Sequence, residues 1–169
     1  MKTPNRHALF AIALLIALFV INWLNNDHQK TLPELSFTTI DGQQHALSQY
    51  KGKPILVIFW ATDCPGCIQE MPELIKLYHV FAESGLTMIG VAMAHDSIDH
   101  IKAMQIKQQM PYLLTWDKDA RIAEAFDNVR VTPTHFLIDP DGDIVMRKIG
   151  ALNFNRLHEK LVNMGLTPS

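Results

Sequence analysis

The fold of this chain is decided by one stretch of sequence, ILVIFWATDCPGC, which runs from Ile55 to Cys67. Its first part, Ile55 to Trp60, is an uninterrupted apolar run rich in β-branched and aromatic side chains, which predicts a strand that is covered on both faces. The residues that follow predict a helix from about Pro65 to Glu83, because proline suits the first helical position and Gly85 ends the helix. Cys64 therefore lies where a buried strand ends and a helix begins.

Two cysteines, Cys64 and Cys67, form a C-x-x-C pair at this junction. The free N–H groups and the dipole of a helix N-terminus favour a negative charge, so they favour the thiolate of Cys64. Cys67 lies one turn further on the same helix face, close enough to resolve a mixed disulfide that Cys64 forms with a substrate. The alternative is half of a zinc site, but the sequence has no second pair of ligands at metal-binding spacing.

The composition around this motif narrows the class of protein. Of 169 residues, 48% are hydrophobic and 19% are charged, which is typical of a globular chain. The formal net charge is −2, so the basic excess that a general nucleic-acid-binding surface needs is missing. Because there are only 2 cysteines, the chain is neither a disulfide-stapled scaffold nor a four-cysteine zinc protein.

The N-terminal part differs from the rest of the chain. An apolar run extends from Ala8 to Leu24, after a short basic start that contains Lys2 and Arg6. Its length is near the lower limit of a membrane-spanning helix, about 17 residues, and it is apolar all round, unlike the striped helix of a globular core. No small-residue cleavage site follows the run, so we expect an uncleaved anchor rather than a removed signal peptide, with Trp23 at the far interface.

These features predict four segments of the chain. They are a cytoplasmic N-terminus at residues 1–7, a transmembrane helix at residues 8–24, a polar linker at residues 25–31 and a globular domain at residues 32–169. The basic residues before the helix outnumber Lys30 after it, which predicts a cytoplasmic N-terminus and an exported domain. The expected location is the inner membrane, with a single span and the domain in the periplasm.

The globular domain combines predicted strands and helices. Strands alternate with helices at first, and a hairpin and one closing helix follow, which indicates an α/β fold with a mixed central sheet and helices on both faces. Strands are expected at residues 35–40, 44–47, 55–60, 86–94, 112–115, 134–138 and 144–149, and helices at residues 65–83, 97–109, 120–126 and 154–164.

Two groups of residues resemble the signatures of one family. The first comprises Asp41-Gly42, Leu47-Ser48 and Lys51-Gly52-Lys53, then Val57 to Thr62, Cys64-Pro-Gly-Cys67 and Glu70 to Leu74; the second is Val131 to Asp139 with Gly142. Together they resemble the TlpA/ResA-like proteins, membrane-tethered and exported thiol–disulfide oxidoreductases related to DsbE and CcmG. The resemblance implies a thioredoxin fold with an insertion near Ser97 to Thr115. It also implies no cofactor beyond the redox-active disulfide, and several members of the family work in cytochrome c maturation.

The resemblance further implies roles for residues around the cysteines. Pro133 matches the family's cis-proline beside the active-site sulfurs, and Thr132 next to it would offer backbone groups to an extended substrate strand. Trp60 and Asp63 would complete the surface that a substrate meets. Glu70 matches the acidic residue three positions after the second cysteine, where it would move protons for the buried thiol. The alternative for Glu70 is a solvated position on the helix face.

Two positions depart from the family pattern. Thioredoxin-like proteins usually carry Trp directly before the first cysteine, whereas this chain has Asp63, whose charge opposes thiolate formation at Cys64. Six residues before Cys64, where thioredoxins place a buried Asp, this chain has Ile58, so Glu70 is the nearest candidate in sequence for proton handling. Pro72 does match the family, whose proline at this point bends the helix around the sheet.

Two histidines suggest an alternative function. His95 follows a strand that should run parallel to Ile55–Trp60, so it is expected near the cysteines, and His135 lies two residues after Pro133. With the cysteines they would form the copper site of a metal-centre assembly factor, although a loop residue and a hydrogen-bonded strand residue are the simpler interpretations, and we assign no metal ligand. A peroxidase needs Pro and Thr at set spacing before the reactive cysteine, and here Thr62 is one position too close.

The sequence therefore predicts an exported, membrane-tethered thiol–disulfide oxidoreductase. Its partners would be disulfides of periplasmic client proteins and, as the resemblance implies, a membrane thiol donor of the DsbD or CcdA type. No nucleic-acid partner is expected. Reduction is the expected direction, because Pro65 and Gly66 between the cysteines carry no charge and Asp63 disfavours a strongly acidic cysteine.

Overall fold

The central sheet is built around β3 (Ile55–Trp60), whose six residues are all buried. The computed structural model describes residues 12, 14–17 and 31–169. Successive side chains of a strand point to opposite faces of the sheet, so a strand can be apolar throughout only when both faces are covered. Two separate clusters of buried apolar residues provide this cover: Leu56, Ile58 and Trp60 belong to one, and Ile55, Val57 and Phe59 belong to the other.

The sheet has five strands in the order β5-β4-β3-β6-β7. The four besides β3 are β4 (Thr87–Ala92), β5 (Leu113–Trp116), β6 (Thr134–Ile138) and β7 (Ile144–Ile149). β4 is parallel to β3 and β5 is parallel to β4, whereas β6 is antiparallel to β3 and β7 is antiparallel to β6. Parallel neighbours need long crossover connections and an antiparallel hairpin needs only a turn, so helices fall between the early strands and a tight turn joins the last two.

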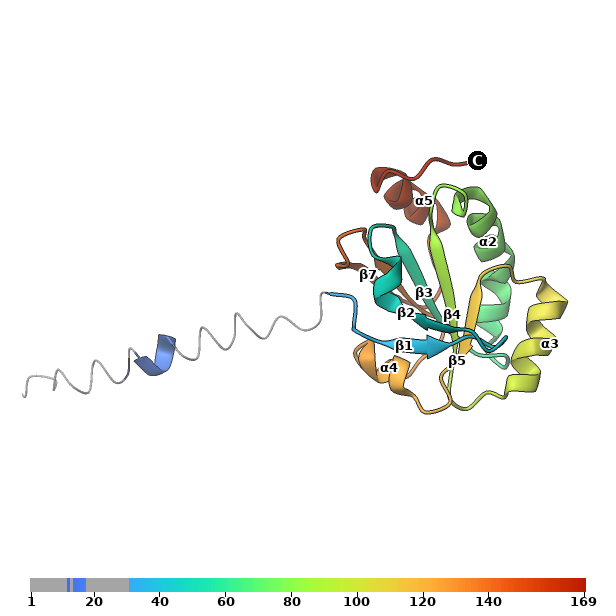
Figure 1. Ribbon diagram of the computed structural model, residues 1–169, viewed down its shortest axis with the longest axis horizontal. Coiled ribbons are helices and arrows are strands. Elements are labelled where there is room, and N and C mark those ends of the chain that lie inside the picture. The colour runs from blue at the N-terminus through green and yellow to red at the C-terminus, as the bar shows by residue number, and fades with distance from the viewer. Residues whose placement is uncertain (1–11, 13, 18–30) are drawn as a thin grey trace, which may run out of the picture. The chain divides into compact units, whose positions relative to one another are not determined.

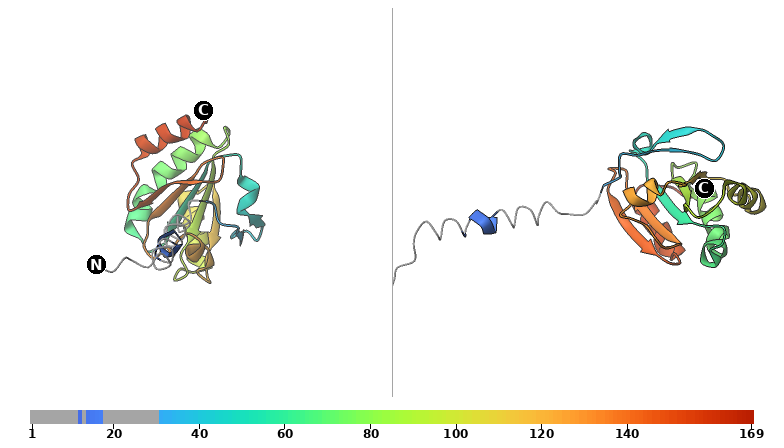
Figure 2. Two further views of the ribbon diagram at one scale, coloured as in Figure 1. Left: turned by 90° about the vertical axis from the view of Figure 1, so that its left-hand side faces the viewer. Right: turned by 90° about the horizontal axis from the view of Figure 1, so that it is seen from below.

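Helices cover one face of this sheet, and smaller elements cover the other (Figure 1 and Figure 2). The helices α2 (Pro65–Phe81), α3 (Ile98–Gln108) and α5 (Phe154–Asn163) pack on the face of Leu56 and Ile58. The opposite face carries α4 (Arg121–Ala125), the 3-10 helix η1 (Leu47–Tyr50) and the hairpin of β1 (Ser36–Thr38) and β2 (Gln44–Ala46). The predicted mixed sheet with helices on both faces is confirmed.

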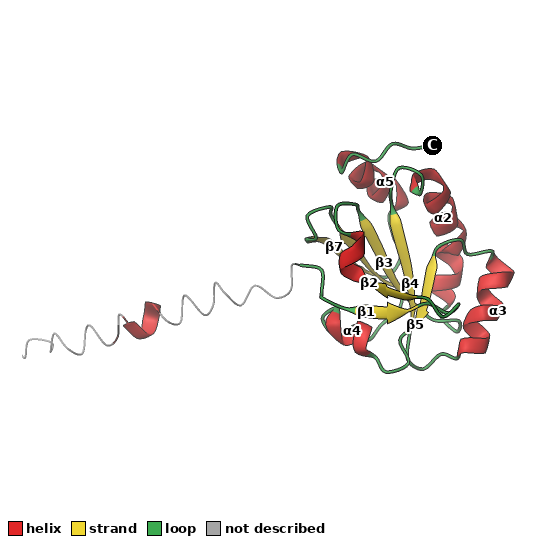
Figure 3. Cartoon of the chain, in the orientation of Figure 1, coloured by secondary structure: helices red, strands yellow, loops and turns green. Residues whose placement is uncertain are grey.

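The strands and helices predicted for residues 32–169 are all present, most of them with shifted ends (Figure 3). β3 and β6 have the predicted bounds, whereas α2 ends at Phe81 instead of Glu83. Gly85 adopts a φ of 114° there, and its N–H and that of Leu86 both donate to the Phe81 carbonyl over 3.1 Å, which turns the chain off the helix. The short helix η1 was not predicted, because a single 3-10 turn has no periodic pattern of its own.

The chain divides at Thr31, and Thr31–Ser169 form one compact unit. Before it, only Ile12 and residues 14–17 are described, and they are helical. The segments predicted at residues 1–7, 8–24 and 25–31 therefore lie almost wholly outside the described residues, and the anchor stays a prediction. Within the described residues, no helix is both long enough and apolar enough to cross a membrane.

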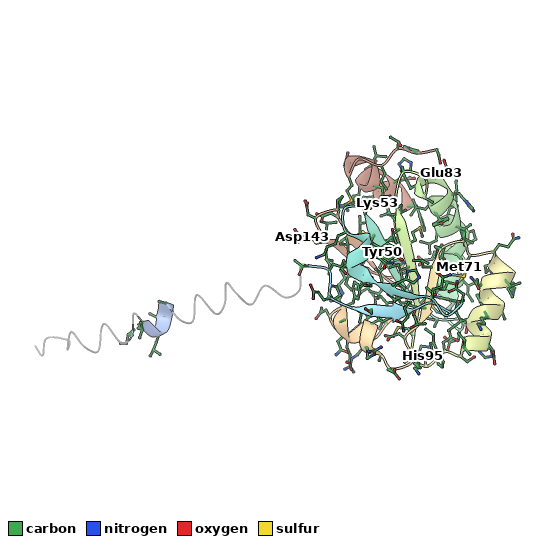
Figure 4. All side chains as sticks on the ribbon, viewed as in Figure 1. Tyr50, Lys53, Met71, Glu83, His95 and Asp143 are labelled. Carbon is green, nitrogen blue, oxygen red and sulfur yellow. A yellow bond between two sulfur atoms is a disulfide. The ribbon has the colours of Figure 1, made fainter. Side chains whose placement is uncertain are left out.

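The direction of β3 and β4 decides where the cysteines lie. Figure 4 shows Lys53, which precedes β3, and His95, which follows β4, at opposite ends of the sheet. Because the two strands are parallel, their carboxyl ends meet at one edge. The cysteines directly after β3 therefore lie at the same edge as the loop that contains His95.

Candidate active site

Cys64 and Cys67 are joined by a disulfide at the N-terminal end of α2. Cys64 is the N-cap residue of the helix, and the backbone N–H of Cys67 donates to its sulfur over 3.2 Å. After reduction, this N–H and the helix N-terminus would stabilise the thiolate of Cys64. Cys64 is 9% exposed and Cys67 is 2% exposed, so Cys64 is the cysteine that a partner reaches first.

The loop of Thr132 and Pro133 lies against the first turn of α2. Their peptide bond is cis, as predicted, and a Cβ atom added to Gly66 would lie 3.5 Å from Cδ of Pro133. The carbonyl of Pro133 accepts a hydrogen bond from the N–H of Gly150 over 2.8 Å. Within the described part of the chain, neither backbone group of Thr132 bonds to another backbone group. Thr132 thus keeps a donor and an acceptor free for an extended partner strand.

Glu70 is buried and paired with His135. It is 6% exposed, so the alternative of a solvated helix residue is wrong. Its Oε1 atom lies 2.6 Å from Nε2 of His135, a residue that is 0% exposed. The remaining atoms of the pair, Oε2 of Glu70 and Nδ1 of His135, are buried and have no hydrogen-bond partner among the described residues. Because Cys67 and Glu70 are both on the buried side of α2, the pair lies one helical turn from the buried cysteine.

His135 lies opposite an apolar residue of the neighbouring strand. Ile58 occupies the position at which the family resemblance implies a buried acid, and β3–β6 pairing places His135 directly opposite Ile58. Residues opposite each other on antiparallel strands point to the same face, so the imidazole projects toward α2. The buried polar group of the site is therefore built from α2 and β6 instead of from β3.

Two aromatic residues, Tyr112 and Trp60, belong to the same buried cluster as the cysteines. Burial and, secondly, the charge of nearby Glu70 raise the pKa of Tyr112. Trp60 belongs to the same buried cluster as both cysteines and is 2% exposed. Its side chain is part of the core and presents almost no surface, so the burial of Trp60 does not support the prediction that it contacts a substrate.

Asp63 faces solvent directly before Cys64 and has a histidine beside it. Nε2 of His95 lies 3.3 Å from Oδ1 of Asp63, and the two side chains are 58% and 75% exposed. His95 thus contacts Asp63, the residue directly before Cys64, and lies at the same edge of the sheet as the cysteines, as the parallel strands predict. When His95 is protonated it offsets the negative charge beside Cys64, although solvent and salt screen a pair this exposed.

Asp96 anchors the loop before the cysteines, and the sequence did not identify it. It is 8% exposed and accepts three hydrogen bonds: from the Thr62 N–H over 2.7 Å, from the Thr62 hydroxyl over 2.8 Å and from the Ser97 N–H over 2.8 Å. The carboxylate thereby ties the end of β3 to the start of α3, 34 residues away. The available signal was the Asp-Ser pair before a predicted helix, which indicates capping and not contact with Thr62.

The two histidines that suggested a metal site lie in different surroundings. His135 is bonded to Glu70 in the core, and His95 lies beside Asp63 at the surface. The described residues contain no group of three or more His, Cys, Asp or Glu side chains that could hold a metal ion. The copper alternative gains no support from this arrangement.

Known proteins resemble this chain in sequence. The AhpC/TSA family matches residues 29–147. The thiol–disulfide oxidoreductase ResA of Geobacillus kaustophilus is 29% identical over 114 residues, which are 68% of this chain and 64% of that protein. ResA of Bacillus thuringiensis is 31% identical over 133 residues, 78% of this chain and 75% of that protein.

The fold is also found among solved structures. A thiol:disulfide interchange protein of the thioredoxin family from Chlorobium tepidum matches with a TM-score of 0.74. The match covers 82% of this chain and 98% of that one, at 24% sequence identity. The predicted thioredoxin fold is thereby confirmed.

Proposed function

This chain belongs to the AhpC/TSA family and, within it, to the ResA-type thiol–disulfide oxidoreductases of thioredoxin fold. From this membership we propose the function of the protein. The proposed function is the reduction of disulfides in exported client proteins by the dithiol of Cys64 and Cys67. The observation that carries this proposal is the disulfide at the start of α2, in which the N-cap cysteine, Cys64, is the more exposed residue.

The proposed reaction has two exchange steps. The thiolate of Cys64 attacks a client disulfide, forms a mixed disulfide and releases the first client thiolate, which takes a proton from water. Cys67 then attacks the sulfur of Cys64, closes the internal disulfide and releases the second client thiolate. Two electrons pass from the dithiol to the client. Thr132, beside Pro133, would hold the client strand through its free backbone groups, and Asp63 would border the same surface.

Glu70 is proposed to handle the proton of Cys67 in the second step. Its burial one turn from Cys67 supports this role, because no solvent-exposed base has direct access to a thiol that is 2% exposed. Glu70→Gln should slow the second step and change its dependence on pH while the fold is kept. A pH–rate profile identical to that of the wild type would contradict the role.

The proposed direction is supported by the neutral Pro65-Gly66 pair between the cysteines and by Asp63 next to Cys64. Both disfavour the strongly stabilised thiolate of an oxidant. The reduction potential should lie nearer thioredoxin's roughly −270 mV than the roughly −120 mV of the oxidant DsbA. Equilibration with glutathione buffers measures it, and a potential above about −150 mV would contradict the reductant proposal. A reductant in an oxidising compartment needs a membrane thiol donor of the DsbD or CcdA type.

We place the protein at the inner membrane, with the anchor at residues 8–24 and the domain in the periplasm, where cytochrome c maturation is one candidate pathway for its clients. The apolar run and the missing cleavage site support this location. The mature protein should remain in the membrane fraction and retain the run. N-terminal sequencing that begins near residue 25 or later would contradict the anchor.

A trapping experiment tests the proposed function itself. Cys67→Ser should accumulate long-lived mixed disulfides with client proteins, because the resolving thiol is gone. Cys64→Ser is the matched control and should trap few, since its remaining thiol is buried. Equal trapping by both variants would contradict the assignment of Cys64 as nucleophile and Cys67 as resolving thiol.

A further inference from the structure

A buried histidine, His135, lies beside the proposed active site and has no role in the function proposed above. We propose that His135 is a positioning residue: it holds one oxygen of Glu70, so that the other oxygen is kept free to exchange a proton with Cys67. This inference rests on the proposed function, in which Glu70 serves the resolving thiol.

The geometry of the pair supports this role. His135 lies on β6, between β3 and β7, where the strand is fixed on both sides by sheet pairing. Its Nε2 lies 2.6 Å from Oε1 of Glu70, and neither residue is more than 6% exposed. A short bond to a rigid strand fixes the rotation of the carboxylate, whose Oε2 atom has no partner in the described part of the chain. One oxygen is thus held while the other stays available.

The charged groups around the pair also indicate that His135 offsets the cost of burying the Glu70 carboxylate. Among the described residues, the only ion-pair partner of Glu70 is His135. The other titratable groups toward this site are Cys67 on α2 and the phenol of Tyr112, while Lys148, opposite His135 on β7, is exposed. A buried carboxylate without a partner is costly. The hydrogen bond between Oε1 and Nε2 supplies the polar partner that the buried Glu70 needs.

The proton step follows from this arrangement. When Cys67 attacks the mixed disulfide, its S–H bond breaks and the proton passes to Oε2 of Glu70. A bond forms between the sulfurs of Cys67 and Cys64, and the bond from Cys64 to the client sulfur breaks. The client leaves as a thiolate. When the thiol donor later reduces the disulfide, Oε2 returns the proton to Cys67.

The reaction of the reduced full-length protein, in detergent, with 5,5′-dithiobis(2-nitrobenzoate) tests the proposal by stopped flow. Attack by Cys64 releases the first coloured thionitrobenzoate, and resolution by Cys67 releases the second. The first phase reports the proposed nucleophile, and the second reports the step that His135 is inferred to assist. Absence of the first phase in the wild type would therefore refute the proposed function, separately from any result on His135.

Three variants are compared in the second phase. Glu70→Gln should slow it by about 100-fold and His135→Leu by about tenfold, because general acid–base catalysis contributes about 10²-fold or more. His135→Gln, which can place an N–H near the position of Nε2, should stay within about threefold of the wild type. The first phase should be unchanged in all three.

A double variant and a matched control complete the experiment. Because His135 is inferred to act through Glu70, adding His135→Leu to Glu70→Gln should slow resolution by less than about twofold more. His158→Leu removes a half-buried histidine whose ring centroid lies 4.9 Å from that of Phe81, at the far end of α2 from the cysteines. This variant should leave both phases unchanged. The inference would be overturned if His135→Leu completed the second phase at the wild-type rate. It would also be overturned if the second phase of His135→Gln were as slow as that of His135→Leu.

Discussion

Replacement of Asp96 should destabilise the protein in graded steps, because its buried carboxylate accepts three hydrogen bonds. Asp96→Asn can keep the oxygen that faces the Thr62 hydroxyl and the Ser97 N–H. It would turn an NH₂ group toward the Thr62 N–H, which now donates to Oδ2 over 2.7 Å. Asp96→Ala removes all three acceptors.

The expected loss in the free energy of unfolding follows from the number of hydrogen bonds that each substitution removes and from the solvent exposure of their donors. A hydrogen bond to a charged group contributes about 1.5–3 kcal/mol. Asp96→Asn loses one such bond and weakens two, so the free energy of unfolding should fall by about 2 kcal/mol. Asp96→Ala should cost about 4 kcal/mol and not the full sum, because Thr62 and Ser97 are only half-buried and water can reach their donors.

Urea unfolding of the oxidised full-length protein in detergent, followed by circular dichroism, measures these changes. Asp99→Asn is the matched control, because Asp99 is an exposed acidic residue in the first turn of the same helix, α3, and its loss should cost less than about 1 kcal/mol. If Asp96→Asn were as stable as the wild type, or if Asp96→Ala cost no more than Asp96→Asn, the account of Asp96 as the anchor of this loop would be wrong.

Three further outcomes test other parts of the site. Burial raises the pKa of Tyr112 above its ordinary value of 10.0, so the unfolded chain loses the phenol proton at a lower pH than the folded protein does. The protonated phenol therefore stabilises the fold fully below about pH 10, and this contribution is lost as the pH rises further. Tyr112→Phe should reduce the fall in the free energy of unfolding between about pH 8 and about pH 11, measured by urea unfolding. Gly90→Ala would place a Cβ atom 2.6 Å from Cδ2 of Leu114 and should lower the free energy of unfolding by about 1–3 kcal/mol, and an unchanged urea midpoint would contradict this. Asp63→Asn removes an exposed charge next to Cys64 and should make the couple more oxidising by no more than about 20 mV in glutathione equilibration, since exposed charge pairs contribute about 0.2–1 kcal/mol; a shift toward a more reducing potential would refute the reasoning.

The sequence by itself determined the features that depend on neighbours along the chain. The apolar run of β3 predicted a buried strand with the observed bounds, because a strand that is apolar at every position needs cover on both faces. The C-x-x-C pair was placed at the start of α2 by the strand before it and by Pro65 within it. The cis bond before Pro133 followed from resemblance to a family, since local residues alone do not favour it.

Only the tertiary structure decided which buried polar groups meet. Glu70 and His135 are 65 residues apart, and their contact depends on the pairing that sets His135 opposite Ile58 and on the packing of α2, which carries Glu70, against that face of the sheet. The bonds from Thr62 to Asp96 likewise require that two parallel strands end at one edge of the sheet. The physical reason is that periodicity and turn residues specify each element separately, whereas a buried carboxylate is stabilised by whichever donor the strand order and register bring to it.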